Sequence, residues 1–348
     1  IIMYNENIRN KKHNRGGDNL ATISDVAKLS GISVSTVSRV INDSPHVSPE
    51  KRQKVLDAME QLGYTPMQAA RQMRGSGSQN IAVVIPSITN TFFAYLVNAI
   101  ERTCREQDYK TLIIQTYGEK ELEEEALNLL KLHHVDGVIL CALENDKSFI
   151  QSYARYGGLV ICNEYSDDDS ISSIQGKQYE GFYQATEYLI SKGYQRIAYC
   201  AGTKTVIIQP IGVNINTDRY MGYAEALSAH NMAANPGFVY TRVRTFEDGQ
   251  EFIRNYAKQE IRPDAVIAGS DQVAAGMVFE AGKQGIRIPE DLAIMGVDDQ
   301  PIATQIEIPL TTIHQPVEEE GQLAATEKLR QISGEKKKPD RKKLDLPL

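Results

Sequence analysis

Apolar residues spaced three and four positions apart predict a helix near the start of the chain. The stretch after Thr22 carries four of them, Ile23, Val26, Ala27 and Leu29. Thr22 or Ser24 can cap this helix, because a side-chain hydroxyl accepts from the free N–H groups of the first turn. Gly31 breaks the pattern, as a turn between two crossed helices requires. The pattern therefore predicts a helix, a tight turn and a second element.

A second short helix is predicted to begin after Ser33, which is a good N-cap. Its inward side holds Val37, Val40 and Ile41. Its outward side is small and mostly polar and holds Val34, Ser35, Ser38 and Arg39. Such a face suits the major groove of DNA, where bulky apolar groups would leave base edges unpaired. Two amphipathic helices joined by a glycine turn also occur in other helical domains, so the spacing alone leaves DNA binding open.

A third helix is predicted from Ser48 and Pro49, an N-cap and first-turn pair, to Gly63. Its inward stripe holds Val55, Met59 and Leu62. The segment that follows, YTPMQAARQMRGSGS, offers only about two helical turns, and so short a helix is marginal alone in water. We therefore expect a linker that folds only on a partner.

From Ile81 onward, short apolar runs alternate with longer amphipathic stretches. The expected strands are 81–86, 111–116, 137–141, 159–163, 196–200, 265–269 and 292–297. The expected helices are 92–108, 120–133, 178–192, 218–230, 247–259 and 271–284. Continuous apolar strands separated by helices indicate parallel sheets that are covered on both faces. The pattern restarts near Gln178, so we predict an α/β body of two similar lobes, with ligands at the carboxyl ends of the strands.

The composition adds that the chain is globular, since 41% of its 348 residues are apolar and 24% are charged. No apolar run approaches the roughly 20 residues that a membrane span needs, and the start of the chain has no secretory apolar core. We therefore expect a cytoplasmic protein without a membrane partner. The scattered cysteines favour reduced structural thiols over a disulfide or metal role; they are Cys104, Cys141, Cys162 and Cys200.

The overall charge of −7 is unevenly distributed. Residues 1–78 hold 11 Lys and Arg against 7 Asp and Glu, a net of +4, and the remainder holds 27 against 38, a net of −11. A basic head on an acidic body is the asymmetry expected if only the head meets phosphates.

Catalytic motifs are missing from the sequence, which has no GxSxG, HExxH, P-loop or GxGxxG pattern. His133 and His134 close an expected helix, where a surface or helix-dipole role is favoured over a metal site. Asp298 and Asp299 follow an expected strand, and capping of the next turn is the alternative to a ligand role there. We expect no enzyme, no catalytic residues, no metal and no cofactor.

The stretch TISDVAKLSGISVSTVSRVIN, residues 22–42, resembles the N-terminal signature of the lactose-repressor (LacI/GalR) family of bacterial transcription regulators. The resemblance extends from Thr22 to the last residue. It implies a three-helix helix-turn-helix head and a hinge helix, followed by a two-lobed body of the periplasmic-binding-protein type. The expected boundaries are a polar tail at 1–19, the head at 20–64, the hinge and linker at 65–78, and the body at 79–348. Within the body, lobe one is expected at about 79–175 and 312–345 and lobe two at about 176–311.

The resemblance assigns the head to double-stranded operator DNA. Base edges are expected to meet Val34, Ser35 and Arg39, and phosphates to meet Thr36, Asn42 and His46. Thr22, Ser33 and Ser38 complete the expected DNA-binding set of the head. In the hinge, Ala69 and Ala70 are small enough for two helices to approach, and Met73 stands where the family usually has a leucine wedge. A homodimer should read a pseudo-palindromic site.

The resemblance also implies a small-molecule effector between the lobes. The expected contacts are Asn90, Phe92, Phe93, Glu164, Arg219, Asp271, Asp298 and Gln315, with Ser270 beside Asp271. Glu164 stands where the family usually has Asp. Aromatic faces mixed with fork donors and carboxylate acceptors suit a polyhydroxyl ligand, such as a sugar or sugar derivative. The loop 203–218 is longer than the family usually has, so no specific sugar carries over.

The leading interpretation is a transcription regulator, of the repressor type, whose operator affinity a metabolite controls. The alternative is a sugar-binding transport protein without a DNA role, which uses the same two-lobed body. That alternative predicts an export signal and no basic three-helix head, and the sequence meets neither expectation.

Overall fold

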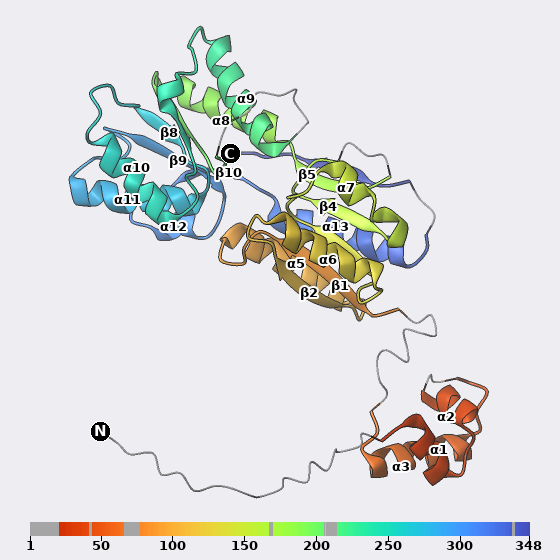
Figure 1. Cartoon of the computed structure of the whole chain (residues 1–348). Helices are drawn as coiled ribbons and strands as arrows, with labels where there is room; N and C mark the ends of the chain where they lie inside the picture. The colour runs from red at the N-terminus through yellow and green to blue at the C-terminus, as the bar shows by residue number, and fades with distance from the viewer. Residues whose placement is uncertain are drawn as a thin grey trace, which may run out of the picture. The chain divides into compact units, whose positions relative to one another are not determined.

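The protein is described from a computed structural model, which covers residues 21–41, 44–65, 77–166, 170–204, 206, 214–335 and 338–348. The chain divides into two compact units, Ile1–Ser76 and Gly77–Leu348. Figure 1 shows the three helices of the first unit in red and orange and the α/β body from orange to blue.

The first unit is built from three helices, α1 (Ile23–Ser30), α2 (Val34–Ile41) and α3 (Pro49–Leu62). Thr22 and Asp25 form a capping box at the start of α1, so Thr22 rather than Ser24 is the cap. Gly31 and Gly63 end α1 and α3 in the left-handed region, at φ 66° and 59°. The core of the unit consists of Val26, Val37, Val40, Val55 and Ala58.

One of the four apolar residues that predicted α1 lies outside this core. Leu29 is 45% exposed and points away from this core, whereas Val26 is fully buried. Ile23 and Ala27 of the same helix are partly buried and pack against the core. The helix-turn-helix prediction itself is confirmed.

Lobe one of the body contains a six-stranded parallel sheet in the order β11-β5-β4-β3-β1-β2. Its strands are β1 (Asn80–Ile85), β2 (Lys110–Gln115), β3 (Gly137–Leu140), β4 (Leu159–Cys162), β5 (Ser172–Gly176) and β11 (Arg341–Leu344). Its helices are α5 (Thr91–Arg105), α6 (Lys120–Lys131), α7 (Lys147–Gln151), the short η1 (Ala154–Tyr156) and α13 (Val317–Ile332). Alternate residues of β1 belong to different apolar cores. Ile81 packs in a core with α5 and α13, and Ala82 packs in a core with α6, so both faces of the sheet are covered.

Lobe two contains a five-stranded parallel sheet in the order β10-β9-β8-β6-β7. Its strands are β6 (Ile197–Ala201), β7 (Val239–Thr241), β8 (Ala265–Ile267), β9 (Ala293–Asp298) and β10 (Thr311–His314). Its helices are α8 (Gln178–Ser191), α9 (Ile215–Ala229), η2 (Pro236–Phe238), α10 (Phe246–Tyr256), α11 (Asp271–Gln284) and α12 (Ile302–Gln305). Helices α8 and α9 pack together over one core and α10 and α11 over another, which confirms the predicted parallel α/β architecture.

The chain passes between the lobes at three places. Strand β5 leads directly into α8, and β10 leads into α13, which packs on α5 of lobe one. After β11 pairs with β5, Leu346 joins the apolar core of lobe two. The carboxyl ends of the strands in both lobes therefore lie close to these connections (Figure 1).

Candidate functional site

Helix α2 presents the outward face that the sequence predicted. Val34 is 45% exposed, and Ser35 and Arg39 are exposed as well. Val37 and Val40 are buried against α1 and α3 and fix which side of α2 faces outward. The Ser33 hydroxyl lies 3.1 Å from that of Ser35 and 3.0 Å from that of Thr36, so the start of α2 offers a cluster of small donors and acceptors.

The remaining predicted DNA contacts differ in their surroundings. Thr22 bonds the Asp25 carboxylate through its hydroxyl at 2.7 Å, so this side chain also holds α1 together. Ser38 is half-buried on α2, and His46 is exposed in the turn before α3. Asn42, Ala69, Ala70 and Met73 lie outside the described residues.

In the body, Arg219 is the centre of the predicted effector residues. It lies on α9, where the N-cap Asn214 accepts from Thr217 N–H and fixes the start of the helix. Its Nε donates to Gln178 Oε1 at 2.8 Å, and its guanidinium lies 5.2 Å from the Phe182 ring centroid. Gln178 in turn exchanges two hydrogen bonds with Gln315, at 3.1 and 3.2 Å. Gln178, which the sequence reasoning missed, therefore joins Arg219 to Gln315.

Asp298 ends β9 and faces the same arginine. Burial raises its pKa to about 8, Arg219 opposes this shift, and the nearby Asp271 adds to it. The backbone at Asp298 has φ 103°, in the region that non-glycine residues rarely adopt. Backbone strain of this kind concentrates at ligand and active sites. The placement therefore supports a ligand role for Asp298 over simple capping.

Glu164 follows β4 of lobe one and is half-buried. Burial raises its pKa to about 7, while Arg219 and Lys147 both favour its ionised form. Because Glu164 belongs to lobe one and Arg219 and Asp298 belong to lobe two, the structure brings residues from both lobes into one electrostatic cluster.

Other predicted residues have protein partners instead. Asp271 is fully buried, and its two oxygens accept from Thr312 Oγ1 and Gln300 N–H, each at 2.6 Å. These bonds favour a structural role for Asp271 in lobe two, where Ser270 caps the same helix, α11. In lobe one, Asn90 caps α5 through Phe92 N–H at 3.0 Å.

The two predicted aromatic residues differ from each other. Phe92 is 5% exposed and belongs to the core of lobe one, so it is not a free face for a ligand. Phe93 is half-buried and lies edge-on to it, with ring centroids 5.2 Å apart. Most of the loop 203–218 lies outside the described residues.

The sequence reasoning missed two residues near Arg219. Tyr165 OH donates to Asp218 Oδ2 at 2.8 Å, which links lobe one to lobe two beside Arg219. Glu320 on α13 is 1% exposed and carries a carboxyl next to the backbone of Asn163. Glu320 was hidden in the run Glu318–Glu319–Glu320, which reads as an ordinary acidic first turn; only its spacing of four from Ala324 and eight from Lys328, both buried, marks it as inward-facing.

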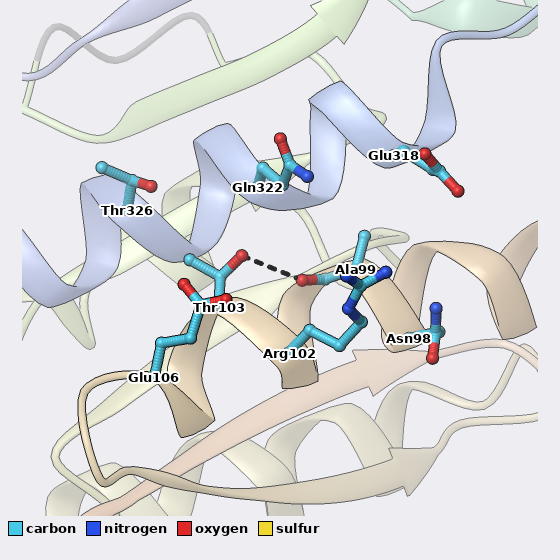
Figure 2. A pocket seen from close by; sticks show the side chains of 8 residues that line it. All are labelled: Asn98, Ala99, Arg102, Thr103, Glu106, Glu318, Gln322 and Thr326. Atoms are coloured by element: carbon cyan, nitrogen blue, oxygen red, sulfur yellow. Dashed lines mark hydrogen bonds between the residues drawn. The ribbon is translucent and has the colours of Figure 1, made fainter.

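Two grooves lie near α13, apart from this cluster. Figure 2 shows one of about 310 Å³ between α5 and α13, where Thr103 Oγ1 donates to Ala99 O at 3.0 Å. None of the predicted effector residues lines it. A second groove, of about 480 Å³, is lined by Gln315 together with Asp299 and His314, which are bonded at 2.8 Å. Of the predicted effector residues it has only Gln315, so neither groove coincides with the Arg219 cluster.

The acidic, histidine and cysteine side chains bear on metal binding, and the helices bear on membrane insertion. In the described ranges, no group of three or more His, Cys, Asp or Glu side chains is arranged to hold a metal ion. All four cysteines are free thiols and buried. No helix in the described part of the chain is long and apolar enough to cross a membrane.

The chain is similar to known regulators over nearly its whole length. Residues 22–67 match the family model described as bacterial regulatory proteins, lacI family. Residues 78–347 match the model described as periplasmic binding proteins and sugar binding domain of LacI family. The chain is 37% identical over 315 residues to the NTD biosynthesis operon regulator NtdR of Bacillus subtilis, which covers 90% of this chain and 94% of that one.

Two solved structures extend the comparison. The lac repressor dimer bound to operator and the anti-inducer ONPF has a TM-score of 0.77 and 25% identity, covering 94% of this chain and 97% of that chain. A LacI family transcriptional regulator from Lactobacillus casei with bound sucrose has a TM-score of 0.70 and 32% identity, covering 77% of this chain and 97% of that chain.

Proposed function

The chain belongs to the LacI family of bacterial regulatory proteins, and from this premise we propose that a small polyhydroxyl effector, bound between its two lobes, sets its affinity for operator DNA. Like its relatives, it is a DNA-binding transcription regulator with a sugar-binding type of body. The proposed parts are a DNA-reading head at 20–64, a hinge and linker at 65–78 and a sensing body at 79–348.

The base-reading face in this proposal consists of Val34, Ser35 and Arg39 on α2. All three are exposed, and the Arg39 side chain has no hydrogen-bond or ion-pair partner in the described part of the chain. A free guanidinium can fork onto guanine O6 and N7, which is the commonest specific contact to a base. Thr36 and His46 are proposed to lie nearer the phosphates, where contacts position the head without reading sequence.

The proposed assembly is a homodimer, as in the lac repressor dimer that is bound to operator. Two-fold symmetry in the protein imposes a pseudo-palindromic site on double-stranded DNA. Selection from random DNA by the full-length chain tests both points. We expect two inverted half-sites; single asymmetric half-sites would contradict the dimer, and the absence of any enriched sequence would contradict operator binding.

The observation that carries the effector proposal is the placement of Arg219. Its Nε is held by Gln178, which is bonded to Gln315 at the start of the connection to lobe one. No other hydrogen bond or ion pair of Arg219 occurs within the described ranges, so its two terminal nitrogens are free to meet a ligand. Asp298 and Glu164 approach from lobe two and lobe one respectively. Hydroxyl groups both donate and accept, so they suit an arginine flanked by carboxyls.

A ligand that touches both lobes binds one relative arrangement of the lobes better than others. It can shift the conformational equilibrium only by that difference in affinity. Lobe one connects to the linker through β1, so a shift of the lobes alters the positions from which the two linkers of a dimer leave. The expected coupling between effector and operator is on the order of 1–3 kcal/mol.

A thermal-shift panel tests the sensing proposal. The full-length chain is heated with sugars, phosphorylated sugars and purines, each at saturating concentration, and the Arg219→Ala variant is run beside it. A ligand that raises the melting temperature of the wild type but not of the variant supports the site, because binding to the native state stabilises it by mass action. An equal rise in both proteins would place the ligand elsewhere.

A further inference from the structure

Helix α13 buries a glutamate where its neighbours are small and apolar. Glu320 shares the inward side of the helix with Gly321, Ala324 and Ala325, which pack on lobe one. At Gly321 a Cβ would come within 2.7 Å of Ala99 Cβ, so α13 lies tightly on α5 next to Glu320. The Glu320 side chain is 1% exposed.

The Glu320 carboxyl points at the end of β4. The backbone N–H of Asn163 interacts with it, and Glu164 is the next residue along. Its Oε1 has no hydrogen-bond partner among the described residues, and neither has Oδ1 of Asn163, a side chain that is 6% exposed. Buried acceptors are almost always satisfied in native proteins, so two unsatisfied ones on residues that contact each other indicate a place where a donor binds.

Three carboxyl groups lie near the single guanidinium of Arg219. Burial raises the pKa of both Glu320 and Asp298 to about 8 and that of Glu164 to about 7. The charge of Glu164 adds to the rise at Glu320, and the charge of Glu144 adds to the rise at Glu164. Arg219 favours the ionised form of all three carboxyls, and Lys147 contributes at Glu164 alone. No carboxylate oxygen of the described chain forms an ion pair with Arg219. The one guanidinium of Arg219 therefore stabilises the ionised forms of three carboxyls.

We propose, on the basis of the effector function above, that the effector carries an ammonium group beside its hydroxyls, as an amino sugar does, and that Glu320 is the residue that selects it. An ammonium group donates three hydrogen bonds and accepts none, so it matches a site whose buried oxygens lack donors. In the free protein at pH 7 the Glu320 carboxyl holds its proton, and an ammonium group that binds there favours release of that proton to solvent. The resulting charge-assisted bond is roughly twice as strong as a neutral one.

Titration calorimetry with matched sugars tests the proposal. The full-length chain is titrated at pH 7 with glucosamine and its β-1,4-linked dimer, and with their neutral counterparts, glucose and cellobiose. We expect at least one amine to bind roughly tenfold or more tightly than its neutral counterpart, because a buried hydrogen bond to a charged group stabilises that much. Glu320→Gln should remove most of this preference. Glu320→Asp, which keeps the charge, should retain part of it.

The matched control is Glu319→Gln, which alters an exposed carboxyl on the same helix and should keep the full preference. Operator binding by each variant checks that it is folded. If a neutral sugar binds as well as its amine, or if Glu320→Gln keeps the preference, the ammonium proposal is wrong while the sensing function stands. If no sugar of either class binds, the ammonium proposal is also wrong, and operator binding then decides the regulator function separately.

Discussion

The hydroxyl of Tyr165 in lobe one donates a 2.8 Å hydrogen bond to the carboxylate of Asp218 in lobe two. Both side chains are 4% exposed, and Asp218 directly precedes Arg219. Burial, followed by the charge of Asp218, raises the pKa of Tyr165, so the phenol stays protonated as the donor. The two lobes are thus bonded to each other beside the proposed effector site.

Tyr165→Phe removes this bond and leaves the ring in place. We expect effector affinity to change several-fold, since an interlobe hydrogen bond contributes about 1 kcal/mol to one arrangement of the lobes. Calorimetry with the bound sugar measures the change. Tyr188→Phe on the exposed side of α8 is the control. Equal affinity in wild type and Tyr165→Phe would show that this bond does not take part in the lobe equilibrium.

Asp136 holds the first residues of the body. Its carboxylate accepts from Ser78 N–H at 2.6 Å, from Ser78 Oγ at 2.9 Å and from Gln79 N–H at 2.8 Å. Asp136→Asn should weaken these bonds, lower stability by about 1–3 kcal/mol and reduce operator affinity without changing effector affinity. Urea unfolding and operator titration measure the two effects, with the exposed Asp146→Asn as control. Unchanged operator affinity would remove Asp136 from the coupling between body and linker.

Glu320 should make stability depend on pH in a predictable direction. Its pKa rises from an ordinary 4.5 to about 8, so the folded state binds a proton that the unfolded state has released. The contribution of Glu320 to stability is therefore full below about pH 4.5 and is lost as pH rises through about 8. Glu320→Gln should be more stable than the wild type at pH 8, on the order of 2 kcal/mol, and should lose this advantage towards pH 5.

Urea unfolding of both proteins at the two pH values measures that difference. Glu164 and Asp298 titrate in the same range in both proteins, so only the difference between variant and wild type reports on Glu320. A constant difference at pH 5 and pH 8 would contradict a buried carboxyl with a raised pKa.

Arg39 is predicted to read a base. Arg39→Ala should relax preference at one symmetric position per half-site, at a cost of about 1–3 kcal/mol for the correct base. Selection from random DNA with wild type and variant measures this. Lys54→Ala, an exposed cation on α3, should leave every base preference unchanged. Uniform weakening on all sequences by Arg39→Ala would make Arg39 a phosphate contact.

The strands show how far the sequence leads. All seven apolar runs form strands, whereas β5, β7, β10 and β11 were not predicted because SSIQG, VYT, TTIH and RKKL are short and mostly polar. Three of the four lie at sheet edges, where one side of the strand needs no partner. The polar strand β5 is buried within its sheet, and tertiary bonds satisfy it: Ser172 Oγ donates to Glu327 of α13 at 2.5 Å.

The residues near the proposed effector site also separate into those that the sequence predicted and those that only the structure reveals. Arg219, Asp298 and Glu164 were predicted from the family resemblance, and Asp298 and Glu164 also stand at the ends of apolar strands that could be read from the sequence. Gln178, Tyr165 and Glu320 were not, because their roles depend on which segments the crossovers bring together. A glutamate in an acidic first turn is solvated in most helices, and only the packing of α13 on lobe one makes Glu320 a buried group.

The most direct test of the regulator is operator titration at one fixed salt concentration, with and without the sugar that binds most tightly, because phosphate contacts make the affinity salt-dependent. Wild type is compared with Arg219→Ala and Asp298→Ala, and with the exposed control Arg105→Ala. We predict that both site variants bind operator like the wild type without sugar and fail to respond to it, while Arg105→Ala responds fully. A full response by Arg219→Ala, or its loss of operator binding without sugar, would contradict an effector site centred on Arg219.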